Sequence, residues 1–136
     1  MKQLFIDTNI VLDLLGRREP FYRDAAKLFS LADRGKVKLY LSALTMANAH
    51  YVLSKLKTPE EARVILARFK VLVVVLALND KIIELSLNDA SFKDFEDGIQ
   101  YYTALENQSE IIITRNLKDF RQAKIPVMTA SQYLAK

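Results

Sequence analysis

Three short stretches of the chain carry carboxylate, hydroxyl or amide side chains. Asp7-Thr8-Asn9 follows an apolar run near the start, 94-DFED-97 holds three acids in four residues, and Thr114-Arg115-Asn116 follows three isoleucines. Oxygen atoms of these types are the ligands that Mg²⁺ prefers, and Mg²⁺ usually needs only one or two protein carboxylates. The first two stretches are therefore candidates for a metal site. The basic residues in and after the third could hold phosphates near that metal, or they could belong to a solvated loop.

Each stretch also has a purely structural explanation. Asp7 is typical of an Asx-turn or of a helix N-cap. Asp94 can cap a helix that carries Asp97 at its third position, where negative charge interacts favourably with the helix dipole. Asp119, taken alone, is typical of a surface loop. Three acids within four residues nevertheless repel one another, and a bound cation would relieve that repulsion.

Several other chemistries lack the residues that they need. His50 is the only histidine and there is no cysteine, so the usual zinc sites and disulfides are excluded. Neither Ser42 nor Ser54 lies in a nucleophile-elbow sequence, and there is no glycine-rich nucleotide-binding motif. A phosphoryl-accepting receiver domain needs an aspartate after its third strand, and a haloacid-dehalogenase-like phosphatase needs D-x-D-x-T. The sequence contains neither pattern.

Length and composition are those of an ordinary globular protein. The 136 residues fit one domain that buries roughly two-thirds of its unfolded surface. The formal charge of +4 and the pI of about 9.3 suit a polyanionic partner such as nucleic acid, although many other domains are equally basic. No apolar run suggests a signal peptide or a membrane segment. Because cysteine is absent as well, we expect a cytoplasmic protein with no membrane partner.

Strand-like and helix-like segments alternate along the chain. The expected strands are residues 3–7, 36–41, 71–76, 110–114 and, as a short fifth, 126–128. The expected helices are residues 9–15, 21–33, 42–55, 58–69, 79–87 and 94–107, with a last one opened by the capping box at 129–132. The strands are almost continuously apolar, and residues 71–76 in particular predict a strand covered on both faces. This alternation predicts an α/β fold with a parallel sheet.

Ligands of parallel sheets bind beyond the carboxyl ends of the strands, at the point where the strand order reverses. Asp7 and Thr114 each stand at the carboxyl end of a predicted strand. We therefore expect both side chains at the same rim of the sheet.

Four segments carry a more specific signal over nearly the whole chain. They are F-I-D-T-N from residue 5, L-S-A-L-T-M-A-N from residue 41, D-F-E-D-G-I-Q-Y-Y-T-A-L-E from residue 94 and I-I-I-T-R-N-L-K-D-F from residue 111. In this order and spacing they resemble the PIN domain, and most closely the compact bacterial PIN proteins that include VapC-type toxins. The resemblance implies one PIN-like domain over residues 1–136, folded as a three-layer α/β/α sandwich with a mainly parallel sheet.

The resemblance also implies an activity and partners. It implies an endoribonuclease that depends on Mg²⁺ or Mn²⁺ and acts as the toxin of a toxin–antitoxin module, with RNA as substrate, a cognate antitoxin as partner, and a homodimer. The site residues carried over from the family pattern are Asp7, Asn48, Asp97, Thr114, Asn116 and Asp119. Of these, Asp7, Asp97 and Asp119 are the expected metal ligands.

Two of these positions depart from the family pattern. Asn48 stands where a glutamate is usual, and Asn116 fills a position that is acidic in many members and asparagine in others. An amide oxygen can bind a cation but brings no formal charge. Asp7 and Asp97 would then be the two firm carboxylates, which favours one cation over a two-metal arrangement. A second hypothesis follows, a catalytically degenerate PIN domain that binds RNA or a protein without cutting.

Basic residues near these motifs are candidates for contacts with the RNA backbone. They are Arg17, Arg18, Lys55, Arg115 and Lys118.

Overall fold

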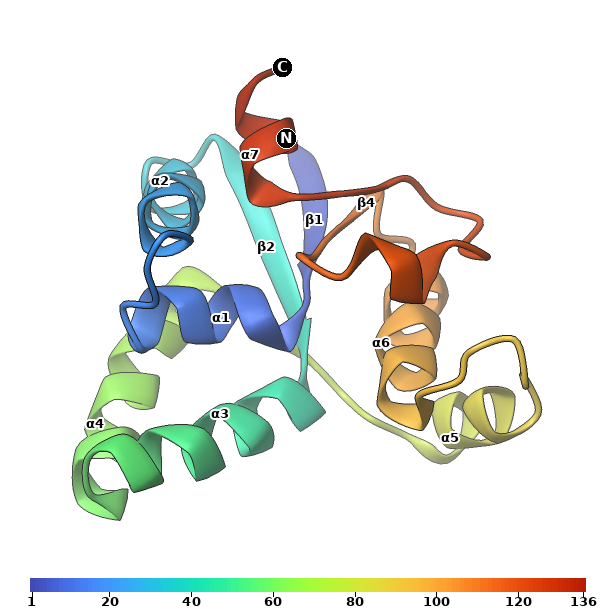
Figure 1. Ribbon diagram of the computed structural model, residues 1–136, viewed down its shortest axis with the longest axis horizontal. Helices are drawn as coiled ribbons and strands as arrows, with labels where there is room; N and C mark the ends of the chain where they lie inside the picture. The colour runs from blue at the N-terminus through green and yellow to red at the C-terminus, as the bar shows by residue number, and fades with distance from the viewer.

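The computed structural model describes all residues from Met1 to Lys136. Its centre is a five-stranded sheet in the order β3-β2-β1-β4-β5, in which every neighbouring pair is parallel (Figure 1). The strands are β1 (Lys2–Ile6), β2 (Val37–Ser42), β3 (Val74–Leu76), β4 (Ile111–Ile113) and β5 (Val127–Met128). The predicted α/β fold with a parallel sheet is confirmed.

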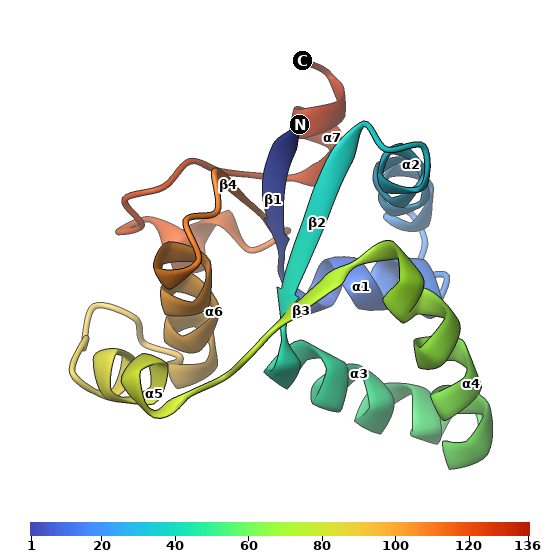
Figure 2. The ribbon, with the colours of Figure 1, turned by 180° about the vertical axis from the view of Figure 1, so that it is seen from behind.

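Helices cover both faces of the sheet. They are α1 (Thr8–Leu15), α2 (Tyr22–Asp33), α3 (Ala43–Leu56), α4 (Pro59–Phe69), α5 (Asp80–Leu87), α6 (Phe95–Glu106) and α7 (Ala130–Leu134), with 3₁₀ turns η1 (Lys70–Leu72) and η2 (Leu117–Phe120). Helices α1 to α4 and α7 lie on one face, and α5 and α6 lie on the other (Figures 1 and 2). This arrangement is the expected three-layer sandwich. None of the helices combines the length and the apolar content that crossing a membrane would require.

Alternation along the central strand β1 explains why two cores form. Leu4 and Ile6 point into the larger core beneath α1, α2, α3, α4 and α7, whereas Phe5 points into the smaller core with Phe92 and Tyr101. Successive side chains of a strand face opposite sides of the sheet. A central strand between two helical layers must therefore be apolar at every position, and the three residues are all fully buried.

The strand predicted at residues 71–76 differs from the structure. Its first part is the 3₁₀ turn η1, and only Val74–Leu76 pairs with β2, at the edge of the sheet. Val71 is 84% exposed and Val74 is 36% exposed, so the segment is not covered on both faces. The reason is that α6 packs over β2 and leaves this edge strand partly open on that face. An apolar run does not reveal whether its strand lies at the centre or at the edge of a sheet.

The strand order places the switch point next to β1. The chain adds β2 and β3 on one side of β1 and then crosses to add β4 and β5 on the other side. Ile6 pairs with Ile113, and the backbone N–H of Asp7 donates to the Ile113 carbonyl at 3.0 Å. Asp7 and Thr114 therefore leave adjacent strands side by side at the carboxyl rim, as the sequence predicts.

Candidate active site

Asp7 is both a helix cap and a buried carboxylate at the switch point. Its Oδ1 accepts a hydrogen bond from the Thr8 backbone N–H at 2.8 Å, and its Oδ2 accepts from Thr114 Oγ1 at 2.7 Å and from Asn9 Nδ2 at 3.2 Å. The residue is 5% exposed. Burial raises the pKa of the Asp7 carboxyl, and the three hydrogen bonds oppose that rise because they stabilise the charged form. Asp7 is thus a helix cap and a candidate catalytic residue at the same time.

Asp97 lies in the first turn of α6, which opens as the acidic motif predicts. Asp94 is the N-cap and accepts a hydrogen bond from the Glu96 backbone N–H at 2.8 Å. Partial burial raises the pKa of Asp97 to about 7, and the nearby charges of Asp94, Asp7, Asp119 and Glu96 add to the rise. Asp97 therefore holds its proton far more tightly than a solvated aspartate, and a cation beside it would stabilise its charged form.

Asp7 and Asp97 line one cleft of about 260 Å³, which we call the acidic cleft. Its lining residues are Asp7, Thr8, Asn9, Leu12, Arg18, Asn48, Asp94, Glu96, Asp97, Gln100 and Asn116. Leu12 is the only apolar residue among them, so the cleft is suited to ions and polar groups. Four of the six predicted site residues lie on it.

The other two predicted site residues lie next to the acidic cleft. Thr114 is fully buried behind Asp7, where its Oγ1 also accepts a hydrogen bond from the Asn116 backbone N–H at 3.0 Å. Asp119 lines an adjoining cleft that shares Asp97 with the acidic cleft. Its charge raises the pKa of both Asp7 and Asp97.

Asn48 has an acidic neighbour that its place in the sequence does not reveal. Its Nδ2 donates to Oε1 of Glu96, at 3.4 Å, across the gap between α3 and α6. A carboxylate from α6 is thus brought beside the position where the sequence of α3 supplies an amide.

The oxygen donors of the acidic cleft suit a hard cation. The structure contains no group of three His, Cys, Asp or Glu side chains arranged to hold a metal together. Asp7 and Asp97 could supply two carboxylates, Asn48 and Asn116 could supply amide oxygens, and water would complete an octahedral shell. This set fits one Mg²⁺ or Mn²⁺ ion, and it lacks the nitrogen and sulfur ligands that zinc usually takes.

The predicted basic residues divide into two groups. Arg18 lines the acidic cleft and Lys118 lines the adjoining one. Arg17 and Lys55 line neither cleft, and each places its charge over a tyrosine ring. Lys55 lies roughly two helical turns beyond Asn48 on α3.

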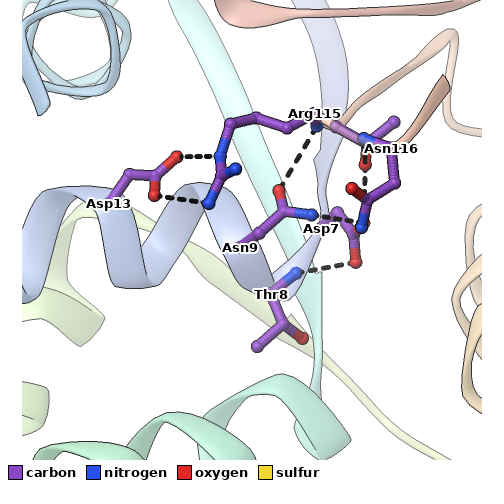
Figure 3. A network of polar contacts seen from close by, with 7 residues as sticks. Asp7, Thr8, Asn9, Asp13, Arg115 and Asn116 are labelled. Atoms are coloured by element: carbon purple, nitrogen blue, oxygen red, sulfur yellow. Dashed lines mark hydrogen bonds and ion pairs between the residues drawn. The ribbon is translucent and has the colours of Figure 1, made fainter. Parts of the chain in front are cut away.

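The guanidinium of Arg115 is directed away from the acidic cleft (Figure 3). Its Nε and Nη2 donate to the two carboxylate oxygens of Asp13, at 2.8 and 3.0 Å, and it lies 3.9 Å from the centre of the Phe21 ring. Its backbone N–H donates to Asn9 Oδ1 at 3.4 Å. Arg115 therefore anchors the loop after β4 to α1, a role different from the predicted contact with RNA.

Gln100 is a site residue that sequence reasoning missed. It is 3% exposed, and its Nε2 donates to Thr8 Oγ1 at 3.0 Å and to Thr45 Oγ1 at 2.9 Å. The two threonine hydroxyls also bond to each other, at 2.8 Å. One amide thus joins α6, α1 and α3, the three helices that surround the acidic cleft. The sequence feature that could have identified Gln100 is its position three residues after Asp97, which puts a polar side chain on the inward face of the same helix.

Replacing Gln100 by leucine is expected to lower the free energy of unfolding by about 1–3 kcal/mol, because the buried hydroxyl of Thr45 and the partly buried hydroxyl of Thr8 lose the amide donor. Urea unfolding measures this cost. The double variant Gln100→Leu/Thr45→Val is the control, since removing both partners of a hydrogen bond should cost less than the sum of the single changes. If Gln100→Leu unfolded at the same midpoint urea concentration as the wild type, the network would not stabilise the fold.

Comparisons with known proteins identify the family of the chain. A family model described as PIN domain matches residues 3–118. The chain is 26% identical over 135 residues to ribonuclease VapC1 of Aquifex aeolicus (strain VF5), which covers 97% of this chain and 93% of that protein. It superposes on a chain of a toxin–antitoxin complex from Klebsiella pneumoniae with a TM-score of 0.69 and 27% identity, covering 93% of this chain and 97% of the other.

A more distant structure shows the same fold. A chain of DNA-bound VapBC from Salmonella typhimurium superposes with a TM-score of 0.74 at 17% identity, covering 96% of this chain and 99% of that one. The resemblance expected from the four sequence segments is confirmed, and the chain belongs to the PIN domain family.

Proposed function

We propose that the protein is a metal-dependent endoribonuclease and the toxin of a toxin–antitoxin module. The observation that carries the proposal is that Asp7, which follows β1, and Asp97, on α6, line one polar cleft at the switch point of the sheet. Similarity to a ribonuclease and to a toxin–antitoxin complex over nearly the whole chain supports it.

Mg²⁺ or Mn²⁺ would be held by Asp7 and Asp97. Asn48 and Asn116 would add neutral oxygen atoms or orient water, and Asp119 would act directly or through water. When bound, such a cation supplies an activated water and neutralises charge on the scissile phosphate.

The remaining roles belong to side chains around this pair. The hydroxyl of Thr114 holds Asp7 Oδ2 in place, and Arg115 holds the loop that carries Asn116. Arg18 and Lys118 would contact phosphates on either side of the cleft. The proposed partners are an RNA substrate, a cognate antitoxin and a second copy of the chain, and the proposed compartment is the cytoplasm.

Incubation of the purified protein with a structured RNA tests the activity. We expect cleavage with Mn²⁺, none with EDTA, and at least about a hundredfold loss in Asp7→Asn, because even outer-shell partners of metal ligands contribute up to that much. Asp33→Asn changes an exposed acid on α2 and should keep full activity. Cleavage that survives Asp7→Asn or EDTA would overturn the proposal. A protein that binds RNA but neither cleaves it nor binds Mn²⁺ would indicate the degenerate, non-catalytic alternative.

Thr114→Val is expected to weaken Mn²⁺ binding by about 10- to 100-fold. Valine has nearly the shape of threonine but cannot donate to Asp7 Oδ2, and the lost hydrogen bond allows the pKa of Asp7 to rise further. Titration calorimetry measures the affinity, and Thr114→Ser, which keeps the hydroxyl, should bind Mn²⁺ nearly as the wild type does. Equal affinities for Thr114→Val and wild type would contradict the assigned role.

A further inference from the structure

A second cleft of about 310 Å³ adjoins the acidic cleft and shares Asp94 and Asp97 with it. We call it the basic cleft, and its lining residues are Ser91, Lys93, Asp94, Asp97, Lys118, Asp119, Arg121 and Gln122. None of them is hydrophobic. It lies between the loop that precedes α6 and the η2 segment that follows β4.

Hydrogen bonds hold the two walls of the basic cleft in place. Gln122 Nε2 donates to the Ser91 carbonyl at 2.7 Å and so joins one wall to the other. Asp89 holds the Ser91 end of the first wall, because its carboxylate accepts from the Ser91 backbone N–H at 3.0 Å and from the Tyr102 hydroxyl at 2.7 Å. The cleft therefore has a defined shape before any ligand binds.

The three cations of the basic cleft are free to bind an anion. Lys93, Lys118 and Arg121 are all exposed. The ion pairs of the structure are Lys2–Glu110, Lys81–Glu106 and Arg115–Asp13. None of the three cations forms an ion pair, although three carboxylates line the same cleft.

A polyanionic substrate needs such cations here. The acidic cleft gathers Asp7, Asp94, Glu96 and Asp97, and these charges repel a nucleic acid backbone. Cations that lie beside them, within the distance over which salt leaves charges unscreened, offset that repulsion. Arg18 is the only cation that lines the acidic cleft itself, and the neighbouring cleft adds three cations against one further carboxylate, that of Asp119.

The composition of the basic cleft also indicates which part of a nucleic acid it suits. Proteins that hold bases of a single strand stack them on aromatic side chains, and this cleft has neither aromatic nor aliphatic side chains. Lysine and arginine bind phosphates without reading sequence.

We propose that the basic cleft binds the sugar–phosphate backbone of an RNA strand whose neighbouring phosphodiester lies in the acidic cleft, through Lys93, Lys118 and Arg121. The inference rests on the proposed ribonuclease function and adds to it a sequence-independent backbone subsite on the α6 side.

The test compares two triple variants of equal charge. The first combines Lys93→Gln, Lys118→Gln and Arg121→Gln. The control combines Lys27→Gln, Arg63→Gln and Lys70→Gln, three exposed cations of α2, α4 and η1 on the opposite face of the sheet. Binding of a fluorescent single-stranded oligoribonucleotide is measured in EDTA over a range of NaCl concentrations, so that binding is separated from cleavage.

We expect the slope of log K against log[NaCl] to become shallower by about 2 in the first variant, because each single-strand phosphate contact contributes about 0.7. The control should keep the wild-type slope. An oligomer with abasic sugars should lose affinity less than about twofold relative to the base-bearing one, since only the backbone is held. In Mn²⁺, the first variant should raise KM for cleavage and leave kcat close to wild type, as expected for lost ground-state binding.

The outcomes separate this inference from the proposed function. Equal slopes for the two triple variants would overturn the basic cleft as a subsite, even if the wild type cleaves RNA normally. RNA binding with the expected change of slope but no cleavage by the wild type would overturn the ribonuclease and keep the subsite. A wild type that does not bind RNA would overturn both. Circular dichroism confirms that both variants fold, and the three single variants, each expected to reduce the slope by about 0.7, provide a second measurement.

Discussion

Asp97→Asn is expected to abolish RNA cleavage and, at the same time, to stabilise the metal-free protein above pH 7. Cleavage should fall by at least about a hundredfold, because the variant loses one of the two carboxylates proposed to hold the metal. Stability should rise because partial burial, together with the nearby charges of Asp94, Asp7, Asp119 and Glu96, disfavours the charged form of Asp97. The amide removes that charge and keeps nearly the same shape.

The pH dependence of this effect follows from the direction of the shift. The pKa of Asp97 rises from 3.8 to about 7 on folding. Between these two values the folded protein binds a proton that the unfolded chain has released, so the free energy of unfolding decreases as pH rises. The contribution of Asp97 is fully present below about pH 4 and is lost by about pH 7. Because the side chain is partly exposed, solvent screening reduces the expected difference between variant and wild type to about 1–2 kcal/mol at pH 8.

Urea unfolding in EDTA at pH 4 and at pH 8 measures the difference. The two proteins should be equally stable at the lower pH, and Asp97→Asn should be the more stable one at the higher pH. Asp33→Asn should follow the wild type at both. Added Mn²⁺ should stabilise the wild type and not Asp97→Asn, since a ligand that binds the folded state raises its stability. A variant less stable than wild type at pH 8 would show that the charge of Asp97 does not destabilise the fold.

Arg115→Met is expected to lower the free energy of unfolding by about 3 kcal/mol. The change leaves the carboxylate of Asp13, whose side chain is 1% exposed, buried without its cation and without two hydrogen bonds. Methionine retains much of the packing against Phe21. Arg115→Lys should recover only part of the loss, because one ammonium cannot reproduce the two-pronged bond to both oxygens.

Two controls make this prediction specific to a buried pair. Lys81→Met breaks the exposed pair Lys81–Glu106, whose atoms are 2.6 Å apart, and should cost less than about 1 kcal/mol. The double variant Asp13→Leu/Arg115→Met removes both charges and should regain most of the stability. Even with its stability regained, this double variant should cleave RNA more slowly than the wild type, because the loop carrying Asn116 has lost its anchor on α1. Equal costs for Arg115→Met and Lys81→Met would show that the buried pair does not hold the loop.

Local patterns in the sequence were enough to determine the elements and the rim of the site. Strands alternate with helices that begin after residue types that cap well. The side chains of the N-cap residues Ser42, Thr58, Asn79, Asp94 and Thr129 all accept hydrogen bonds from the first turns of their helices. In a parallel sheet all strand ends meet at the same edge. For that reason Asp7 and Thr114 could be placed together from the order of the elements alone.

Tertiary structure decided the partners of the polar side chains. Arg115 is a plausible RNA contact until the fold brings Asp13, 102 positions away, within 2.8 Å of its guanidinium. Gln100 becomes a link between three helices, and Asn48 acquires Glu96 as a neighbour, only after the two helical layers close around the sheet rim. Periodicity and capping report interactions within a few residues, whereas the partner of a buried charge depends on which distant side chain fills the space beside it.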